Sequence, residues 1–423
     1  MNYLKAKKEE LSALLLSLKA KYDEVLQKGL SLDLSRGKPT AEQLDLSMPM
    51  LGKSRTVADC KSASGFDCRN YGVPLGVPEM RAFWSDLTGI PADNIIVGGN
   101  SSLNLMYDTV ARAMLYGVPG GERPWCREEK VKFLCPAPGY DRHFAICESL
   151  GIEMITVPMK ADGPDMDAVE ALVLDPAVKG IWCVPKYANP TGVTYSDEVV
   201  TRFASMKTAA PDFRIFWDNA YLVHDVYNED TLLNVFDEAK KYGTEDRIFF
   251  FTSSSKITFP GAGVAIMAMS DRNIAWVAPI WNVQTIGHDK LNQLRHLEFL
   301  PDKAAVKALM ARHAEILRRR FDIVLDTLEK DLADTGVATW TRPNGGYFVS
   351  LDVLDGTAKR VFALCRDAGV TLTNVGATFP YGYDPDDKNL RLAPSFPTCE
   401  DLALAMSVLT LAVRMAALEK LLA

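Results

Sequence analysis

The sequence lacks the features that mark most nucleic-acid-binding, metal-binding and disulfide-stabilised proteins. Its 423 residues carry a formal net charge of -7, which argues against a broad phosphate-binding surface and a nucleic-acid partner. The eight cysteines are scattered singly, without a C-x-x-C pair or a histidine at metal-site spacing. A disulfide framework and a metal site are therefore disfavoured, and reduced thiols indicate a cytoplasmic protein.

Targeting and membrane-spanning segments are also missing from the pattern. Residues 1–27 form an amphipathic pattern in which leucines alternate with many Lys and Glu residues, unlike a signal peptide. The most apolar later stretch, 402–413, is closed by Arg414 and is shorter than the roughly 20 residues that a membrane helix needs. We predict a packed C-terminal helix and no membrane partner.

What the sequence does have is a regular alternation of short β-branched or aromatic runs with helical patterns. Such buried runs between helices predict a mostly parallel sheet. We expect an α/β fold whose large domain holds a seven-stranded sheet flanked by helices. The seven predicted strands are 95–97, 131–134, 154–157, 181–184, 215–217, 248–251 and 264–269.

The pattern changes after Asp302, where a long helix is predicted through Lys330. A strand at 347–351, a helix at 357–368, a Pro/Gly/Asp-rich loop at 379–387 and a last helix follow. This region predicts a smaller α+β domain. The expected organisation is an N-terminal helix and arm at 1–48 that is part of the small domain, a large domain at 49–320 and a C-terminal small domain at 321–423.

Four polar side chains follow predicted strands. Tyr140 comes after the strand at 131–134, Asn189 after 181–184, Asp218 after 215–217 and Lys256 after 248–251. Ligands of an open parallel sheet bind in the crevice beyond the carboxyl ends of its strands. One crevice is therefore expected to collect all four.

The chemistry of these residues is informative only as a set. Lys256 leaves a buried strand among small hydroxyl residues, where partial desolvation favours the neutral, nucleophilic amine. Asp218 starts the run Asp218-Asn-Ala-Tyr221, and Asn189 starts Asn-Pro-Thr-Gly192. Taken alone, the lysine could be a surface residue, the aspartate a helix N-cap and the Asn-Pro-Thr-Gly run an ordinary turn.

The ordered set resembles the class I, fold-type I aminotransferases, specifically the aspartate-aminotransferase-like branch. The matching positions span nearly the whole chain: Asn189-Pro-Thr-Gly192, Asp218-x-x-Tyr221, Ser253-x-x-Lys256 and Arg391. The resemblance implies pyridoxal 5'-phosphate (PLP) as cofactor and a fold-type I architecture. It also implies a homodimer with shared active sites.

The resemblance assigns roles to individual residues. Lys256 would carry the cofactor covalently and move the substrate's α-proton. Asp218 would pair with the ring nitrogen, while Asn189 and Tyr221 would hold the ring oxygen. Tyr140, in Pro136-Ala-Pro-Gly-Tyr140, matches the aromatic residue that stacks on the ring.

The phosphate needs separate donors. The run Gly98-Gly99-Asn100-Ser101 opens a predicted helix, whose free amides favour an anion. Ser253 and, across the dimer interface, Tyr71 match further phosphate ligands of the family. One position departs from the pattern, because many relatives have an arginine eight residues after the lysine, where this chain has Val264.

Substrate recognition is expected to depend first on Arg391, since a guanidinium offers two parallel donors to an α-carboxylate. Its apolar neighbours predict a buried strand. Arg36 and Lys290 are candidate cations for a second carboxylate, and Gly37 lies where relatives close a segment over the substrate. Asn189 is expected to contact substrate as well as cofactor.

The leading hypothesis is amino-group transfer between an amino acid, preferably aspartate-like, and a 2-oxo acid such as 2-oxoglutarate. Two alternatives remain open. β-Lyases and decarboxylases share the scaffold, so fold does not choose among them. A non-enzymatic, aminotransferase-like ligand-sensing regulator would need a DNA-binding module, and no basic recognition helix appears in the sequence.

Overall fold

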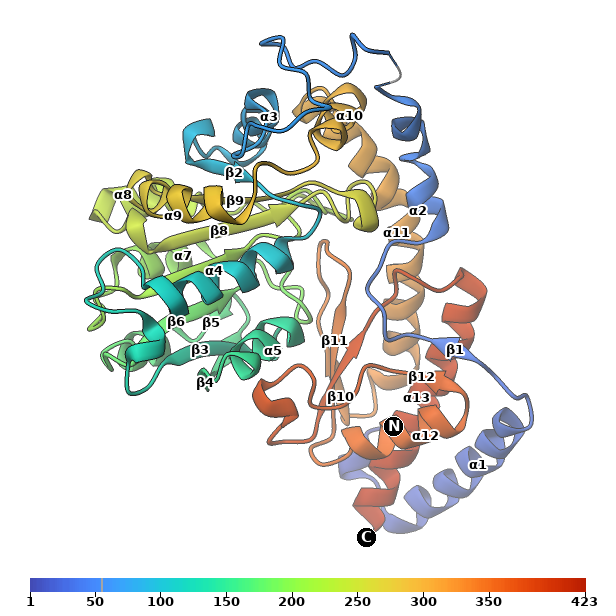
Figure 1. The fold of residues 1–423 in the computed structure, drawn as a ribbon. Helices are drawn as coiled ribbons and strands as arrows, with labels where there is room; N and C mark the ends of the chain where they lie inside the picture. Colours follow the sequence, from blue (N-terminus) through green and yellow to red (C-terminus); the bar gives the residue numbers. More distant parts are fainter. Residues whose placement is uncertain (55) are drawn as a thin grey trace.

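The computed structural model describes residues 1–54 and 56–423, and its largest element is an eight-stranded sheet (Figure 1). The order is β2-β9-β8-β7-β6-β3-β4-β5. The strands are β2 (Ile95–Val97), β3 (Lys132–Ala137), β4 (Glu153–Lys160), β5 (Gly163–Pro164), β6 (Val178–Cys183), β7 (Arg214–Asp218), β8 (Ile248–Ser253) and β9 (Ala265–Met269). The α/β class is confirmed. The sheet has one strand more than predicted, the two-residue β5.

The strand directions make the sheet mixed but mostly parallel. The central pairs β4–β3, β3–β6, β6–β7 and β7–β8 are parallel. The pairs at both ends are antiparallel, namely β8–β9, β9–β2 and β4–β5. Because β3, β6, β7 and β8 all point the same way, the residues that follow them reach the same edge of the sheet.

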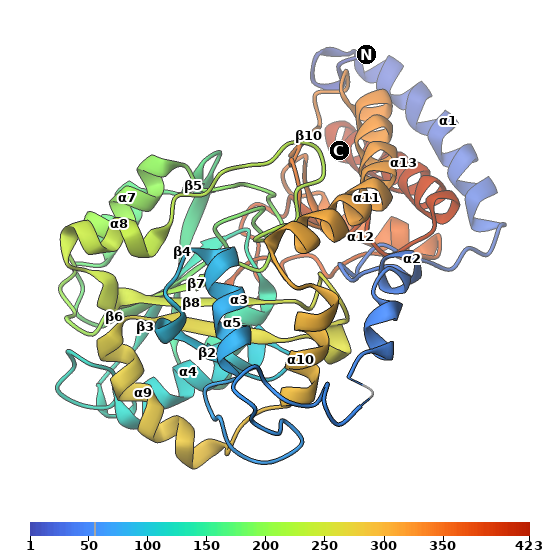
Figure 2. The same cartoon turned by 90° about the horizontal axis from the view of Figure 1, so that it is seen from above.

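Helices cover both faces of this sheet (Figure 2), which is why β6, β7 and β9 are buried along their whole length. One hydrophobic core joins the sheet to α4 (Ser102–Tyr116), α5 (Asp141–Ser149) and α9 (Asp271–Gln284). The core on the opposite face includes residues of α3 (Pro78–Thr88), α6 (Met166–Leu172), α7 (Asp197–Ser205), α8 (Val235–Tyr242) and α10 (Lys290–Phe299).

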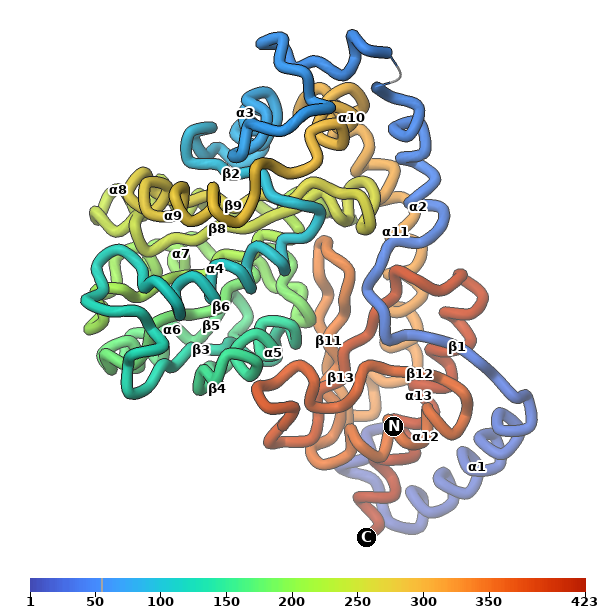
Figure 3. The backbone as a smooth tube through the Cα atoms, viewed as in Figure 1, coloured from blue at the N-terminus to red at the C-terminus, as the bar shows by residue number. Residues whose placement is uncertain are grey.

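A second region combines two small sheets with helices around a core of its own (Figure 3). β10 (Ala338–Trp340), β11 (Val349–Val353) and β13 (Asn389–Leu392) form an antiparallel sheet, and β1 (Leu32–Asp33) pairs with β12 (Val370–Thr371). The helices are α1 (Lys8–Leu26), α11 (Lys303–Leu332), α12 (Ala358–Asp367) and α13 (Cys399–Leu422), and the short α2 (Ala41–Asp45) contacts α11. The predicted strand at 347–351 begins two residues later, at Val349.

The N-terminal segment packs against this second region. Helix α1 packs against α13, and the Tyr22 hydroxyl donates to the Leu364 carbonyl at 2.7 Å. The Tyr3 amide donates to the Thr335 carbonyl at 2.8 Å. The two chain ends consequently lie in the same part of the molecule (Figure 1). The predicted domain boundary at residue 320 falls inside the continuous helix α11.

Helix α13 is longer than the apolar stretch 402–413 led us to expect. It is the one helix in residues 1–54 and 56–423 that is long and apolar enough to cross a membrane, and 67% of its apolar stretch is buried inside the protein. Contacts with α11, α1 and α12 cover it. The argument from length was therefore wrong, whereas the expectation of a packed helix is confirmed.

Candidate active site

The carboxyl ends of the parallel strands open into a cavity of about 100 Å³, which we call the catalytic cavity. Tyr140 follows β3, Asn189 follows β6, Asp218 ends β7 and Lys256 follows β8. All four line this cavity, together with Gly37 and Tyr221. The structure thus brings together, in one small space, six of the residues selected from the sequence.

Lys256 sits in the environment that favours a neutral amine. Burial lowers the pKa of its ammonium, and the negative charge of Asp218 opposes that shift. Its Nζ lies 4.8 Å from the ring centroid of Tyr221 and 5.9 Å from that of Tyr347. A buried lysine near aromatic rings whose pKa is lowered is suited to nucleophilic attack and proton transfer.

Asp218 is a buried carboxylate in which, among the described residues, one oxygen is hydrogen-bonded and the other is not. It is 3% exposed, and its Oδ2 lies 3.1 Å from His143 Nε2. Within residues 1–54 and 56–423, Oδ1 has no hydrogen-bond partner although it is buried. A buried carboxylate oxygen without a partner is costly, so this atom is suited to receive a cationic N–H from a bound group.

His143 is a residue of the site that sequence reasoning missed. It lies in the first turn of α5, three residues after Tyr140, and its ring stacks on Trp182 at a centroid distance of 4.4 Å and an interplanar angle of 9°. It also contacts Tyr140 edge-on at 4.9 Å. His143 therefore fixes the orientation of Asp218 without lining the catalytic cavity.

The phenols of the site remain protonated well above neutral pH. Burial is the main reason why the pKa of Tyr140 and that of Tyr221 are both raised, and the charge of Asp218 adds to each shift. Burial likewise raises the pKa of Tyr347. Tyr221 can therefore act as a hydrogen-bond donor to an anionic oxygen.

Arg391 lies in β13, the buried strand that its apolar neighbours predicted, and its charge is paired. Its Nη1 donates to Asp141 Oδ1 at 2.8 Å and to Asn189 Oδ1 at 3.4 Å. The guanidinium also lies 5.2 Å from the Phe348 ring centroid. Asp141 was not selected from the sequence, and it provides the counter-charge that a buried arginine requires.

Four of the predicted phosphate-binding residues, Gly99, Asn100, Ser101 and Ser253, lie at the end of β2, the start of α4 and the end of β8. Ser101 caps α4 by accepting from the Asn104 amide, and Gly99 and Asn100 immediately precede it. The Ser253 hydroxyl donates to Ser255 Oγ at 2.9 Å, and Ser255 Oγ donates to the Asn100 carbonyl at 3.0 Å. These bonds hold the glycine-rich turn against the end of β8. Val264 is buried in the hydrophobic core.

Besides Arg391 and the glycine-rich-turn and β8 residues Gly99, Asn100, Ser101 and Ser253, three predicted residues do not line the catalytic cavity of this chain, namely Tyr71, Arg36 and Lys290. Tyr71 is 78% exposed. Arg36 is also exposed and forms an ion pair with Asp33 at 3.6 Å. Lys290 is buried at the start of α10, where its Nζ donates to the His288 carbonyl at 3.4 Å. The sequence alone could not show where these side chains lie, because their positions depend on how each segment packs.

Gly37 lies so close to the Phe348 ring that there is no room for a larger side chain at this position. A Cβ at this position would overlap the Phe348 ring, which lines the cavity and lies beside Arg391. We therefore expect Gly37→Ala to displace Phe348 and lower kcat/KM for amino donors roughly tenfold. Steady-state kinetics with Gly261→Ala as control, where nothing lies within 4 Å of the added Cβ, checks this. Equal kcat/KM values for the two variants would contradict it.

Comparisons with known proteins point in the same direction as the geometry. The family profile described as aspartate amino-transferase matches residues 6–423. An aspartate aminotransferase of Corynebacterium glutamicum is 47% identical over 406 residues, which covers 95% of this chain and 93% of that protein. The crystal structure of an aspartate transaminase from the same organism superimposes with a TM-score of 0.97 at 45% identity, covering 100% of this chain and 99% of the other.

A more distant structure shares the fold and contains a cofactor derivative. LysN, an α-aminoadipate aminotransferase of Thermus thermophilus, was solved in complex with N-(5'-phosphopyridoxyl)-L-leucine. Its TM-score is 0.72 at 20% identity, with 94% of this chain and 95% of that chain covered.

Proposed function

The chain belongs to the aspartate aminotransferase family, a family of PLP enzymes, and we propose that it transfers the amino group of aspartate or a similar amino acid to 2-oxoglutarate. The observation that carries the proposal is the catalytic cavity itself. A lysine with a lowered pKa and a buried carboxylate with an unpartnered oxygen line the same space. These are the two groups that PLP chemistry requires.

The residues present fit the cofactor. Lys256 would form the covalent bond, and Asp218 Oδ1 would accept the N–H of the pyridine ring. Asn189 and Tyr221 would donate to the ring oxygen, while Tyr140 would cover one ring face. When bound, PLP supplies an electron sink that stabilises negative charge on the substrate α-carbon.

The chain's own groups would then control protons and orientation. As a neutral amine, Lys256 Nζ would take up and deliver the proton of the substrate α-carbon. The lowered pKa of Lys256 favours the basic form that this transfer needs. His143 Nε2 lies 3.1 Å from Asp218 Oδ2, and in the tautomer that carries its proton on Nε2 it donates to that carboxylate and holds it in place.

We propose that the phosphate is bound without the arginine that many relatives place eight residues after the lysine. Val264 occupies that position in the hydrophobic core. Ser101, Ser253 and the amides of Gly99 and Asn100 would serve as phosphate donors. The position of Gly99, Asn100 and Ser101 at the N-terminus of α4 adds a favourable electrostatic contribution.

Arg391 would bind the substrate α-carboxylate through its two-donor fork. We expect Arg391→Lys to lower kcat/KM by about 10- to 100-fold, because lysine cannot copy a bidentate, charge-assisted contact. The Kd of the cofactor should stay within about twofold of the wild-type value, since Arg391 is not assigned to the cofactor. Steady-state kinetics and a cofactor titration measure the two quantities. A variant with wild-type kcat/KM would remove Arg391 from substrate binding.

Separate half-reactions test the proposed function most clearly. Adding aspartate alone to the yellow holoenzyme should convert the cofactor to its pyridoxamine form, and adding 2-oxoglutarate should restore the aldehyde form. Release of ammonia or carbon dioxide without a 2-oxo acid would instead favour a β-lyase or decarboxylase. A cofactor spectrum that no amino donor changes would contradict transamination.

We further propose that the active enzyme is a homodimer in which Tyr71 of one subunit contacts the phosphate bound by the other. The 78% exposure of Tyr71 in the single chain leaves it accessible for that role. Tyr71→Ala is expected to weaken PLP binding about tenfold, the effect of losing one hydrogen bond to a charged group.

Cofactor titration by fluorescence measures the Tyr71 effect, and Tyr242→Ala is the matched control. Tyr242 is 48% exposed at the end of α8. Unchanged PLP affinity in the Tyr71 variant, or a monomer in sedimentation velocity, would contradict the interfacial role.

A further inference from the structure

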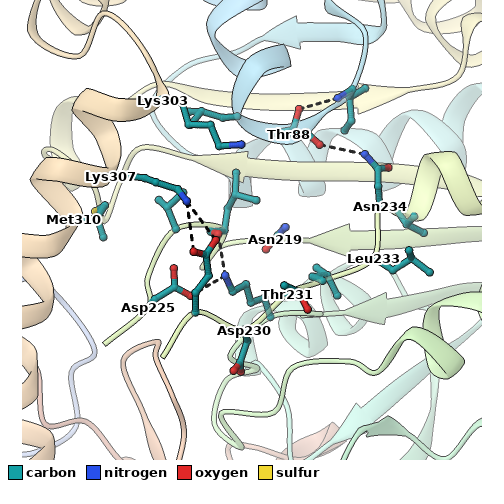
Figure 4. A pocket seen from close by; sticks show the side chains of 18 of the residues that line it. Thr88, Asn219, Asp225, Asp230, Thr231, Leu233, Asn234, Lys303, Lys307 and Met310 are labelled. Atoms are coloured by element: carbon teal, nitrogen blue, oxygen red, sulfur yellow. Dashed lines mark hydrogen bonds and ion pairs between the residues drawn. The ribbon is translucent and has the colours of Figure 1, made fainter. Parts of the chain in front are cut away.

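A second cavity, larger than the catalytic one, lies on the other side of the segment 217–222. We call it the rear cavity. It has a volume of about 450 Å³ and lies between the loop 225–235, the end of α3 and the first turns of α11 (Figure 4). Its apolar lining includes Trp217, Leu233 and Phe250. Lysines and acidic residues form its polar part, so the rear cavity combines apolar and charged surfaces.

The acidic residues of the rear cavity are already engaged. Asp225 pairs with the buried Lys186 at 2.9 Å and accepts from the Tyr187 hydroxyl at 2.5 Å. Asp230 accepts from Thr194 Oγ1 at 2.9 Å and from Asn344 Nδ2 at 2.7 Å. The negative charges of Asp225 and Asp230 are therefore already stabilised by these partners.

The lysines of α11 are less committed. Lys307 contacts Glu229 at 3.4 Å, with both side chains more than half exposed, and such pairs contribute little. The Lys303 side chain has no hydrogen bond or ion pair to any residue in the described part of the chain. Both side chains extend from α11 toward the cavity that they line (Figure 4). An anion is consequently the ligand that this part of the wall favours.

The segment 217–222 lines both cavities. Trp217, Asn219 and Leu222 line the rear cavity, whereas Asp218, Ala220 and Tyr221 line the catalytic cavity. Asn219 is 3% exposed, and its Oδ1 has no hydrogen-bond partner within residues 1–54 and 56–423. A ligand in the rear cavity would thus contact the backbone that positions Asp218 and Tyr221.

We propose that the rear cavity binds a small organic carboxylate with an apolar body, and that its occupancy alters the catalytic cavity through residues 217–222. The carboxylate would pair with Lys303 and Lys307, while Trp217, Leu233 and Phe250 contact the apolar body. The binding half stands apart from transamination. The coupling half rests on the proposed function, because its readout is the cofactor bound at Lys256.

Calorimetry on the holoenzyme tests the binding half, with 4-phenylbutanoate as probe and its uncharged amide as comparison. We expect the acid to bind the wild type and the Arg391→Lys variant equally and the amide to bind at least tenfold more weakly. The double variant Lys303→Met/Lys307→Met should raise the Kd for the acid at least tenfold. Lys330→Met, in the last turn of the same helix, is the control and should not.

The outcomes separate the two halves of the proposal. Binding that is lost in Arg391→Lys but kept in the double variant would place the acid in the catalytic cavity and overturn the binding half. No heat of binding at millimolar concentration would also overturn it. A saturable change in the cofactor's visible absorption with the same Kd supports coupling, whereas binding without that change overturns coupling alone. Unchanged thermal unfolding of the double variant verifies that it is folded.

Discussion

Lys256→Ala is expected to lower kcat for transamination by about four orders of magnitude or more, since it removes both the covalent anchor and the proton-transferring base. No second lysine among the described residues lines the catalytic cavity. The buried Lys186 lines the rear cavity and is held by Asp225, so it cannot substitute. Thermal unfolding and single-turnover kinetics of the purified variant measure the effect.

Two variants separate chemistry from charge and from folding. Lys256→Arg keeps a cation but stays protonated at neutral pH, so we expect it to be as inactive as the alanine variant. Lys207→Ala, which changes an exposed lysine after α7, should retain wild-type kcat. Activity above about one per cent of wild type in Lys256→Ala would conflict with the assigned role, because removing a base of this kind costs at least about a hundredfold.

Asp218→Asn should lower kcat by about two to four orders of magnitude, because a neutral amide cannot stabilise a protonated ring nitrogen. The replacement keeps the shape of the side chain and can still bond to His143. Packing is therefore preserved, and the fall in kcat measures the effect of removing the negative charge of Asp218. Pre-steady-state kinetics of the amino-donor half-reaction would locate the defect in the proton-transfer step.

Asp212→Asn is a matched control for the loss of a buried carboxylate. Asp212 is 1% exposed just before β7, where it pairs with Lys179 at 2.8 Å and accepts from Trp125 Nε1 at 2.9 Å. Breaking this buried pair should destabilise the fold by roughly 3–5 kcal/mol while leaving kcat near the wild-type value. If both variants lost the same activity, the special role of Asp218 would be wrong.

The sequence predicted the large sheet well because burial on both faces leaves a direct signature. Strand β9 is a continuous apolar run, and β7 holds the apolar run 215–217 between Arg214 and Asp218. Such runs bounded by helices have few other interpretations. Two-residue strands such as β1, β5 and β12 have no periodicity of their own. Their existence depends on pairing with a distant segment, so it was not visible in the sequence.

In the candidate site, too, residues marked by their local sequence were predicted, whereas residues whose roles depend on distant partners were missed. Lys256 and Asp218 were found because each lies soon after a recognisable apolar run and belongs to the ordered set of motifs. His143 and Asp141 were missed because their roles depend on partners 75 and 250 residues away, Asp218 and Arg391 respectively. Neither contact follows from spacing along the chain.

Borohydride reduction of the holoenzyme, followed by peptide mass analysis, tests the central claim most directly. Reduction should fix the phosphopyridoxyl group irreversibly on the peptide that contains Lys256, and on no other lysine peptide. Prior incubation with aspartate should remove the modification, since the cofactor then leaves the lysine. A label on a different lysine, or an unmodified Lys256 in protein that still contains PLP, would contradict the account.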